Sequence, residues 1–139
     1  MSDYTVYEVN SKRDYHAFFS FPFRLYKNCD QWVPPITKEE KAIFNPSSNP
    51  VFENADAKLF LVKKGKRVVG RMAAMINWIE VKEQEKTKVR FGWYDTIDDI
   101  EVSRLLLDAV YTWGKQNNLT YLEGPMGFSN MDKAGLLVQ

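Results

Sequence analysis

The sequence contains few of the residues on which disulfides, metal sites and histidine chemistry depend. Its 139 residues include one cysteine, Cys29, and one histidine, His16. A single cysteine excludes an intrachain disulfide and a metal site built from several thiolates. We interpret His16, which lies near Phe18 and Phe19 on an expected helix, as a surface or packing residue rather than a general base. No metal site is predicted.

An excess of charge of one sign is lacking as well. The 19 basic and 18 acidic residues leave a net charge of +1, whereas recruitment of nucleic acid or of an anionic membrane requires a strong basic excess. The longest apolar stretch, residues 68–79, contains Arg71 and Asn77 and is shorter than the roughly 20 residues of a membrane helix. The N-terminus shows no signal peptide pattern. These absences predict a cytoplasmic protein that binds neither nucleic acid nor membrane.

Large apolar side chains, by contrast, are abundant. Hydrophobic residues make up 45% of the chain, which contains four tryptophans, seven tyrosines and nine phenylalanines. This apolar surface is enough to offset the conformational entropy that folding removes. A length of 139 residues suits one hydrophobic core. We therefore predict a single folded domain over residues 1–139.

The hydrophobic pattern predicts both strands and helices. In chain order, the expected elements are a strand at 4–9, helices at 12–25 and 37–44, strands at 57–62, 68–79 and 89–94, a helix at 98–117 and a strand at 119–122. The helix 98–117 joins two strands across a crossover length, so these two strands are expected to be parallel. The predicted class is α/β with a mixed sheet, in the order strand, two helices, a meander of three strands, a helix and a strand.

Polar residues and one proline mark the expected ends and breaks of the helices. Pro22 is expected to kink or split the first helix, because proline has no N–H for the helical ladder. The charged stretch 82–88 is interpreted as a turn or as the ragged end of a hairpin. The expected capping pairs are Ser11 with Asp14, Thr37 with Glu40, and Asp98 with Glu101.

The chain ends on an apolar run, residues 135–139, without a stop signal. We expect that the C-terminal part of the fold lies beyond Gln139, so that the predicted domain is incomplete. The last strand would then have an open edge, which favours pairing with another copy of the chain or packing against the missing region. A homo-oligomer is therefore predicted.

Five short motifs accompany this order of elements. They are Trp32-Val33-Pro34-Pro35, Asn49-Pro50-Val51-Phe52, Val69-Gly70-Arg71, Phe91-Gly92-Trp93 and Gly124-Pro125-Met126-Gly127-Phe128-Ser129. Together with the element order, they resemble the N-terminal section of longer bacterial proteins of the GNAT (acyl-CoA N-acyltransferase) superfamily. The resemblance covers essentially the whole chain and implies a GNAT-like fold.

The resemblance implies that acetyl-CoA or another acyl-CoA binds at the start of the long helix. In the superfamily, a Gln/Arg-x-x-Gly-x-Gly/Ala loop lets backbone N–H groups approach the cofactor pyrophosphate there. The corresponding residues 95–102 contain no glycine and carry four carboxylates, which would repel a pyrophosphate. The cofactor contacts that the resemblance implies are Phe91, Trp93, Ile100, Val102 and Arg104.

Candidate catalytic residues lie at the ends of the last two expected strands. Members of the superfamily commonly use a glutamate or a water chain as base, and on this resemblance Glu123 and Asp95 are candidates for the base. Tyr94 is a candidate to orient a substrate amine. The glycines and proline of residues 124–128 follow a parallel strand, at the edge where α/β sheets bind ligands. Arg71 is expected to pair with a strand carboxylate rather than with a ligand anion.

Two functions are compatible with these residues. The first is an acyl-CoA-dependent N-acyltransferase that acts on an unidentified small-molecule amine, and it rests on the resemblance. The second is a non-catalytic GNAT-like module that binds a small molecule or packs against another domain. The acidic, glycine-free start of the long helix and the apolar end of the chain favour the second function.

Overall fold

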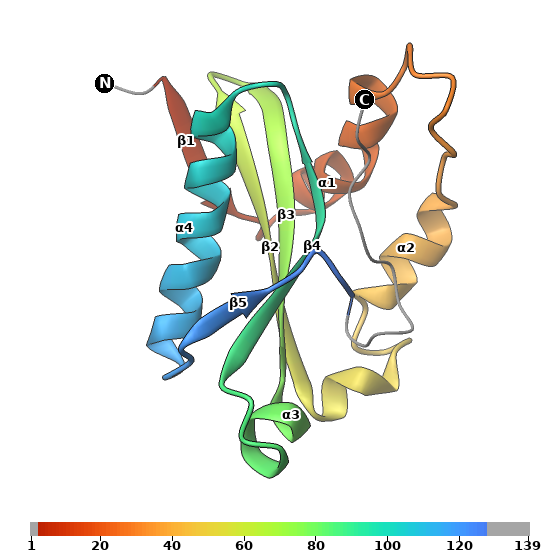
Figure 1. The fold of residues 1–139 in the computed structure, drawn as a ribbon. Coiled ribbons are helices and arrows are strands. Elements are labelled where there is room, and N and C mark those ends of the chain that lie inside the picture. Colours follow the sequence, from red (N-terminus) through yellow and green to blue (C-terminus); the bar gives the residue numbers. More distant parts are fainter. Residues whose placement is uncertain (1–2, 128–139) are drawn as a thin grey trace.

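The computed structural model describes residues 3–127, which form one five-stranded sheet with helices on both of its faces (Figure 1). The strands lie side by side in their chain order, antiparallel except for the parallel pair β4 and β5. The strands are β1 (Tyr4–Glu8), β2 (Ala55–Lys64), β3 (Arg67–Asn77), β4 (Lys88–Thr96) and β5 (Tyr121–Glu123). The predicted fold class and the predicted parallel pair are confirmed.

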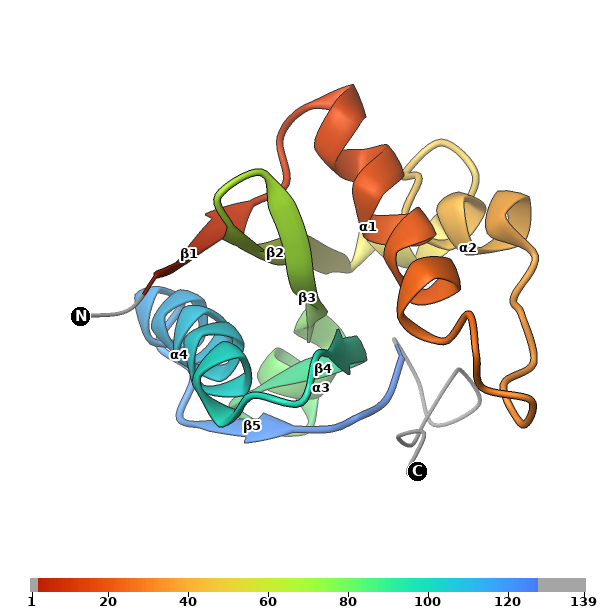
Figure 2. The same ribbon diagram turned by 90° about the horizontal axis from the view of Figure 1, so that it is seen from above.

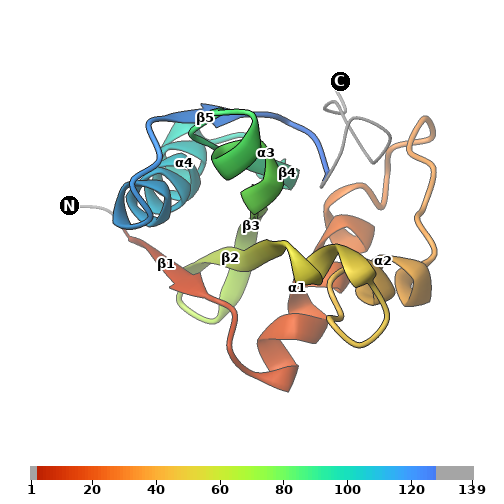
Figure 3. The same ribbon diagram turned by 90° about the horizontal axis from the view of Figure 1, so that it is seen from below.

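The helices form two layers, one on each face of the sheet. Viewed from above, α4 lies on one side of the sheet and α1 and α2 lie on the other (Figure 2). A short helix, α3, lies at the end of the sheet that faces the viewer from below (Figure 3). The helices are α1 (Lys12–Leu25), α2 (Thr37–Ile43), α3 (Trp78–Glu83) and α4 (Ile100–Gln116), with a 3-10 turn at Pro50–Glu53.

The core consists of two clusters, because the inner strands alternate their side chains between the two faces. On one face, Val102, Leu106 and Val110 of α4 are fully buried against the sheet. Their spacing along the helix is the one that places residues on a single face. On the other face, Phe18 and Phe19 of α1 pack edge to face in the second cluster. The sheet therefore contacts two hydrophobic layers, as its apolar inner strands β2 and β3 require.

A bulge in β4 changes which side chains face each layer. Pairing with β3 passes from Ala73↔Gly92 to Arg71↔Asp95, so that Trp93 and Tyr94 together lie opposite one residue of β3. Trp93 has a left-handed backbone, with φ of 47°. A bulge of this kind re-aims the side chains around it. As a result, Trp93 faces the α1 and α2 layer, where its indole N–H donates to the buried carboxylate of Glu40.

The chain leaves β5 by crossing close over β4. The backbone N–H of Met126 donates to the carbonyl oxygen of Phe91 over 2.8 Å. Gly92 makes this approach possible, since a Cβ at that position would lie 2.1 Å from the carbonyl oxygen of Met126. The segment after β5 therefore passes to the side of the sheet that carries α2 (Figure 1).

Helix α1 is not split at Pro22, so one of the two outcomes expected from the sequence, a kink or a split, does not occur. It runs without a break from Lys12 to Leu25, with Pro22 in its last turn. Proline leaves the carbonyl oxygen four residues earlier without its helical donor. That oxygen belongs to Phe18, and it accepts a hydrogen bond of 3.0 Å from Nη1 of Arg71 instead. A side chain from β3 therefore replaces the missing helical bond.

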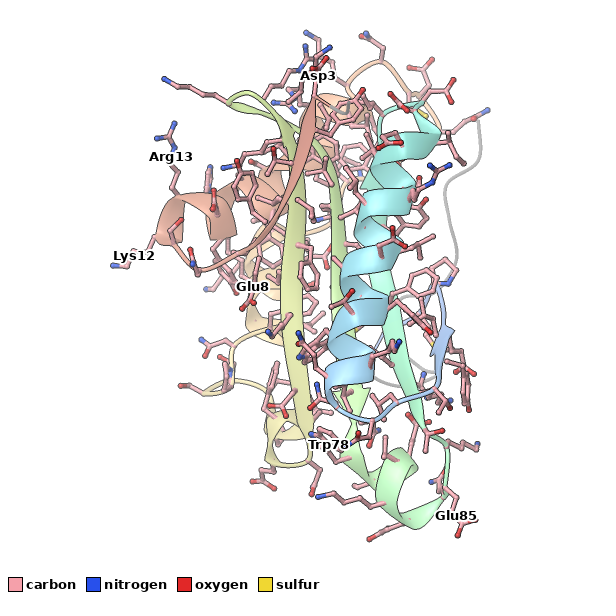
Figure 4. The ribbon with its side chains drawn as sticks, turned by 90° about the vertical axis from the view of Figure 1, so that its left-hand side faces the viewer. Asp3, Glu8, Lys12, Arg13, Trp78 and Glu85 are labelled. Carbon is pink, nitrogen blue, oxygen red and sulfur yellow. The ribbon has the colours of Figure 1, made fainter. Side chains whose placement is uncertain are left out.

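Two of the three expected caps are wrong, and one helix was not expected. Ser11 caps α1 through the N–H of Asp14, as predicted. The cap of α4 is Asp99 rather than Asp98, and α2 begins at Thr37 without a side-chain cap. Residues 78–83, taken as strand end and turn, form α3, which Asn77 caps through the N–H of Ile79 and of Glu80. Side chains of the first turn of α1, such as Lys12 and Arg13, point away from the molecule (Figure 4).

The outer strands β1 and β5 are the edges of the sheet. An edge strand presents unpaired backbone groups that are able to pair with another chain. Association of two copies along β5 stays a prediction, as does the expected C-terminal continuation of the fold. Residues 135–139, on which that second expectation rests, lie outside the described residues.

The contact between β3 and α4 is tested by substituting Gly70. A Cβ at this position would lie 2.5 Å from Cγ1 of Val102, so Gly70→Ala is expected to lower the free energy of unfolding by about 1–3 kcal/mol. Chemical denaturation of both single variants and of the double variant Gly70→Ala/Val102→Ala measures the coupling. The cost of Gly70→Ala should fall once Val102 is shortened, and strictly additive costs would contradict the contact.

Candidate functional site

A buried ion pair joins β3, β4 and the end of α1. Nε and Nη2 of Arg71 lie 2.9 and 2.8 Å from Oδ2 of Asp95. The hydroxyl of Tyr26, just after α1, donates to Oδ1 of the same carboxylate over 2.6 Å. The sequence-based expectation that Arg71 pairs with a strand carboxylate is confirmed. Both oxygens of Asp95 are thus occupied by protein donors.

Burial governs the ionisation of this group. Burial raises the pKa of the Tyr26 hydroxyl well above its usual range, and the hydrogen bond to Asp95 and that residue's negative charge raise it further. Burial also lowers the pKa of Arg71, although the charge and the hydrogen bonds of Asp95 oppose this shift. Tyr26 therefore stays a neutral donor at neutral pH.

A cavity of about 520 Å³ lies between this group and the start of α4. Its walls come from the end of α1, the loop between β4 and α4, and the first turn of α4. The lining residues are Leu25, Tyr26, Thr96, Ile97, Asp98, Asp99, Ile100 and Ser103. In Figure 1 this corner lies at the upper end of the sheet, where α4 begins. Ligands in α/β sheets favour such an edge.

Asp99 is held at the N-terminus of α4 by two hydrogen bonds. Its Oδ1 accepts from the N–H of Glu101 over 2.9 Å, and its Oδ2 accepts from the hydroxyl of Tyr4 over 2.6 Å. Both hydrogen bonds lower the pKa of the Asp99 carboxyl, and the bond from Tyr4 has the larger effect. The carboxylate stays ionised and occupies one of the N–H groups that a helix start offers to an anion. Asp98 beside it is exposed.

The structure places the five expected cofactor contacts in different surroundings. Ile100 lines the cavity and is 78% exposed. The side chain of Val102 is fully buried beneath the sheet, and Arg104 forms an exposed ion pair of 3.7 Å with Glu101. Phe91 is half-buried, and Trp93 is buried against α2. Of the five side chains, only that of Ile100 lines the cavity.

The three candidate catalytic residues are not brought together. Tyr94 faces the α4 side, where its hydroxyl bonds to Ser103 at the cavity wall. Asp95 faces the opposite side of the sheet. Glu123 pairs in register with Arg90, five positions before Asp95 on β4. Because of the bulge, this stretch of β4 runs opposite only four residue steps of β3, from Met75 to Arg71. At about 3.3 Å per strand residue, Glu123 and Asp95 are about 13 Å apart along the sheet.

Glu123 belongs instead to a second cluster of charges, buried or half-buried, that the sequence analysis missed. Lys88 Nζ lies 2.8 Å from Oε1 of Glu123 and 3.4 Å from Oε2 of Glu80. Arg90 holds both oxygens of Glu80, with an Nε–Oε1 distance of 2.9 Å. The available signal was the alternation of Lys88 and Arg90 with Val89 and Phe91, which places two cations on one face of a buried strand.

The architecture is that of the GNAT acetyltransferases. An aminoglycoside acetyltransferase from an uncultured soil metagenomic sample aligns with 90% of this chain and 78% of its own, at a TM-score of 0.61 and 8% identity. An acetyltransferase of Streptococcus agalactiae aligns with 90% of this chain and 76% of its own, at a TM-score of 0.56 and 13% identity. A GNAT-family acetyltransferase of Staphylococcus aureus aligns with 88% of this chain and 73% of its own, at a TM-score of 0.55 and 14% identity. The chain therefore has the GNAT fold, which confirms the fold implied by the sequence resemblance.

Two curated proteins are similar in sequence. The bacterial ceramide synthase of Caulobacter vibrioides is 30% identical over 138 residues, or 99% of this chain and 36% of its own length. Protein YghO of Escherichia coli is 30% identical over 129 residues, which are 93% of this chain and 33% of the length of YghO. The chain thus spans about a third of the length of each of these relatives. No protein-family model matches it.

The described range, residues 3–127, contains neither a membrane-spanning helix nor a cluster of metal ligands. Within that range, no helix combines the length and the apolar character needed to cross a bilayer. The same residues hold no group of three or more histidine, cysteine, aspartate or glutamate side chains placed to bind a metal ion.

The buried ion pair predicts a large loss of stability on Arg71→Met. This substitution leaves Asp95 buried without its cation and the carbonyl oxygen of Phe18 without its donor, so we expect a loss of about 3–5 kcal/mol of unfolding free energy. Arg104→Met is the matched control. It breaks an exposed pair and should cost at most about 1 kcal/mol. Equal losses in chemical denaturation would contradict this account.

The second cluster predicts a specific dependence of stability on pH. Burial alone would raise the pKa of Glu80, but the hydrogen bonds and charge of Arg90, with the charge of Lys88, hold it below its ordinary value of 4.5. A carboxyl with a lowered folded-state pKa stabilises the protein above its unfolded pKa and loses this effect as the pH falls through its folded pKa. The stability difference between wild type and Glu80→Gln should therefore be largest at neutral pH and shrink below about pH 4.5.

Denaturant titrations at several pH values between 7 and 3 measure this difference. Glu85→Gln, on an exposed side chain just after α3, is the control for a simple change of net charge. A difference for Glu80→Gln that stayed constant through the acid range would show that Glu80 has no lowered pKa.

Proposed function

We propose that this chain contributes to an acyl-CoA-dependent N-acyltransferase that acts on a small-molecule amine. The observation that carries the proposal is the cavity at the corner between β4 and α4 of a GNAT fold. This is the corner to which the sequence resemblance assigns the pyrophosphate of the acyl donor. The N-terminus of a long helix provides positive potential and N–H donors for such a group.

The acidic loop modifies how the donor would bind. The carboxylate of Asp99 accepts hydrogen bonds from Tyr4 and from the N–H of Glu101, and Thr96 and Ser103 line the same cavity. We propose that the hydroxyls of Thr96 and Ser103 and the remaining helix N–H groups contact the pyrophosphate. Asp98 and Asp99 would then reduce the affinity for the donor, because like charges repel at this distance.

The distance between the cavity and Glu123 is compatible with an acyl-CoA donor. In acyl-CoA, the extended pantetheine arm separates the pyrophosphate from the reactive thioester. A donor whose pyrophosphate lies at the start of α4 would therefore react further down β4. Glu123 lies in that direction, beside Arg90 and about 13 Å from Asp95 along the sheet.

Glu123 is the residue that we propose as the general base. The nitrogen of the amine attacks the thioester carbonyl carbon, the C–S bond breaks, and Glu123 accepts the proton that the nitrogen loses. The leaving thiolate of CoA takes up a proton from solvent. Tyr94, whose hydroxyl bonds to Ser103, is proposed to orient the bound substrate. Asp95 is proposed to hold Arg71 and Tyr26 in place, since both of its oxygens are already engaged.

A long-chain amine is the acceptor class that we favour. One relative is a bacterial ceramide synthase, and a ceramide is the amide of a long-chain amine and a fatty acid. The segment after α1 exposes Val33 at 83% and Ile36 at 62%. It is connected to the cavity through Trp32, which packs against Tyr26 with ring centroids 5.4 Å apart. Exposed apolar side chains beside a cavity suit an aliphatic chain.

Donor binding is tested by thermal-shift titration with CoA and acetyl-CoA. A ligand at about 100 times its dissociation constant should stabilise the protein by about 2.7 kcal/mol and raise the unfolding midpoint. Pantetheine, which lacks the pyrophosphate, is the control and should give a much smaller shift. If CoA and acetyl-CoA leave the midpoint unchanged, the proposed enzyme function fails for this chain.

The acidic corner predicts that Asp98→Asn binds CoA about three- to tenfold more tightly than wild type, because one repelling charge is removed. The gain should diminish at high ionic strength. Glu85→Gln makes the same change of charge at the opposite end of the sheet (Figure 4) and should leave the affinity unchanged. Equal effects of both variants in calorimetric titrations would point to net charge rather than to this corner.

A further inference from the structure

We infer that Lys88 is a positioning residue for Glu123, and that it acts from a cluster of four buried or half-buried charges on the α2 side of β4 and β5. The inference rests on the proposed function, because it concerns the proposed base. It adds a residue that neither the resemblance nor the relatives assign. The cluster consists of Glu80, Lys88, Arg90 and Glu123.

Lys88 is an unusual lysine because its charge is buried. Its side chain is only 5% exposed and lies within β4, the strand next to β5. Burying an ammonium group is costly unless carboxylates contact it. Here two carboxylates do so, with Nζ 2.8 Å from Glu123 and 3.4 Å from Glu80. Lys88 therefore has little freedom to leave Glu123.

Glu80 fixes the position of Lys88 in turn. Both of its oxygens accept hydrogen bonds from Arg90, which is itself buried. Glu80 comes from the first turn of α3, whose start is held by the side chain of Asn77. A fork-to-fork pair between a guanidinium and a carboxylate restricts the geometry of both groups. The order of contacts runs from Arg90 through Glu80 and Lys88 to Glu123.

Glu123 differs from Glu80 in its access to solvent. Its side chain is 38% exposed, compared with 12% for Glu80. Its Oε1 is held by Lys88, and its Oε2 accepts no hydrogen bond from residues 3–127. One oxygen is therefore fixed by the protein while the other is available to a substrate. This is the arrangement expected of a carboxylate that is oriented to take a proton from an amine.

The charge balance of the cluster supports this division of roles. The cluster contains two cations and two carboxylates, so each of these charges has an opposite charge beside it. Arg90 also donates to Sδ of Met126, in the segment that follows β5. The same cluster thus holds the strand that carries Glu123 and the segment that leaves it.

The test compares Lys88→Met with Lys88→Arg in acyl transfer to a long-chain alkylamine, using the full chain of the natural protein. Lys88→Met should lower kcat by about 10- to 100-fold, the cost of misplacing a catalytic group by about 1 Å. The KM for acyl-CoA should stay within twofold, since the donor corner is distant. Lys88→Arg, which restores a cation, should recover most of the activity. Lys86→Met, on an exposed lysine two residues earlier, is the matched control.

A second measurement does not require activity. In carbon-13 NMR with labelled glutamate, assigned through Glu123→Gln, the carboxyl group of Glu123 should become more mobile in Lys88→Met and not in Lys86→Met. Circular dichroism verifies that each variant is folded. If Lys88→Met does not fold, Lys88→Gln, which keeps a polar group in the cluster and is too short to reach Glu123, gives the same comparison.

The outcomes separate this inference from the proposed function. If wild type transfers acyl groups and Lys88→Met retains its kcat, the positioning role is overturned and the proposed function stands. A rise of KM alone would also overturn it. If wild type transfers no acyl group to any amine, the proposed function fails. The NMR result then decides whether Lys88 holds Glu123, and unchanged mobility overturns that claim as well.

Discussion

The guanidinium group of Arg71 is the contact on which much of the tertiary structure depends. It lies in the middle of the sheet, 2% exposed, and binds the carboxylate of Asp95 on the adjacent strand. It also donates to the carbonyl oxygen of Phe18, which Pro22 leaves without a helical partner, and its charge lies 4.9 Å from the centre of the Phe18 ring. One side chain therefore connects β3, β4 and α1, and it explains why a proline is tolerated inside α1.

Strand β4 is the element through which this framework acts on the candidate site. Its far end carries Asp95 and leads into the loop and cavity at the start of α4. The bulge at Trp93 directs Tyr94 towards that cavity and Trp93 towards α2. Its near end carries Lys88 and Arg90, which hold Glu80 and Glu123. The two ends match the two ends of the proposed donor, a charged pyrophosphate and a reactive thioester.

The two buried charge groups differ in how far the sequence predicts them. Arg71 stands alone in an apolar run, so a carboxylate partner on a neighbouring strand is the expected solution for its charge. The partner of Lys88 is not predictable in this way, because Glu80 comes from α3, within a stretch whose pattern suggested a strand end and a turn. Six residues are too few for helical periodicity to be read with certainty. The Lys88 cluster is assembled by strand pairing and by this short helix.

The sequence by itself determined the order and type of the main elements, the parallel last pair of strands and the acidic, glycine-free start of α4. These follow from local periodicity and from the length of a crossover, which are properties of neighbouring residues. Only the tertiary structure decided that α1 continues through Pro22, that Asp95 and Glu123 are separated along the sheet, and that Glu123 is paired with Lys88. These depend on register, on a bulge and on the satisfaction of buried charges, which involve residues far apart in the chain.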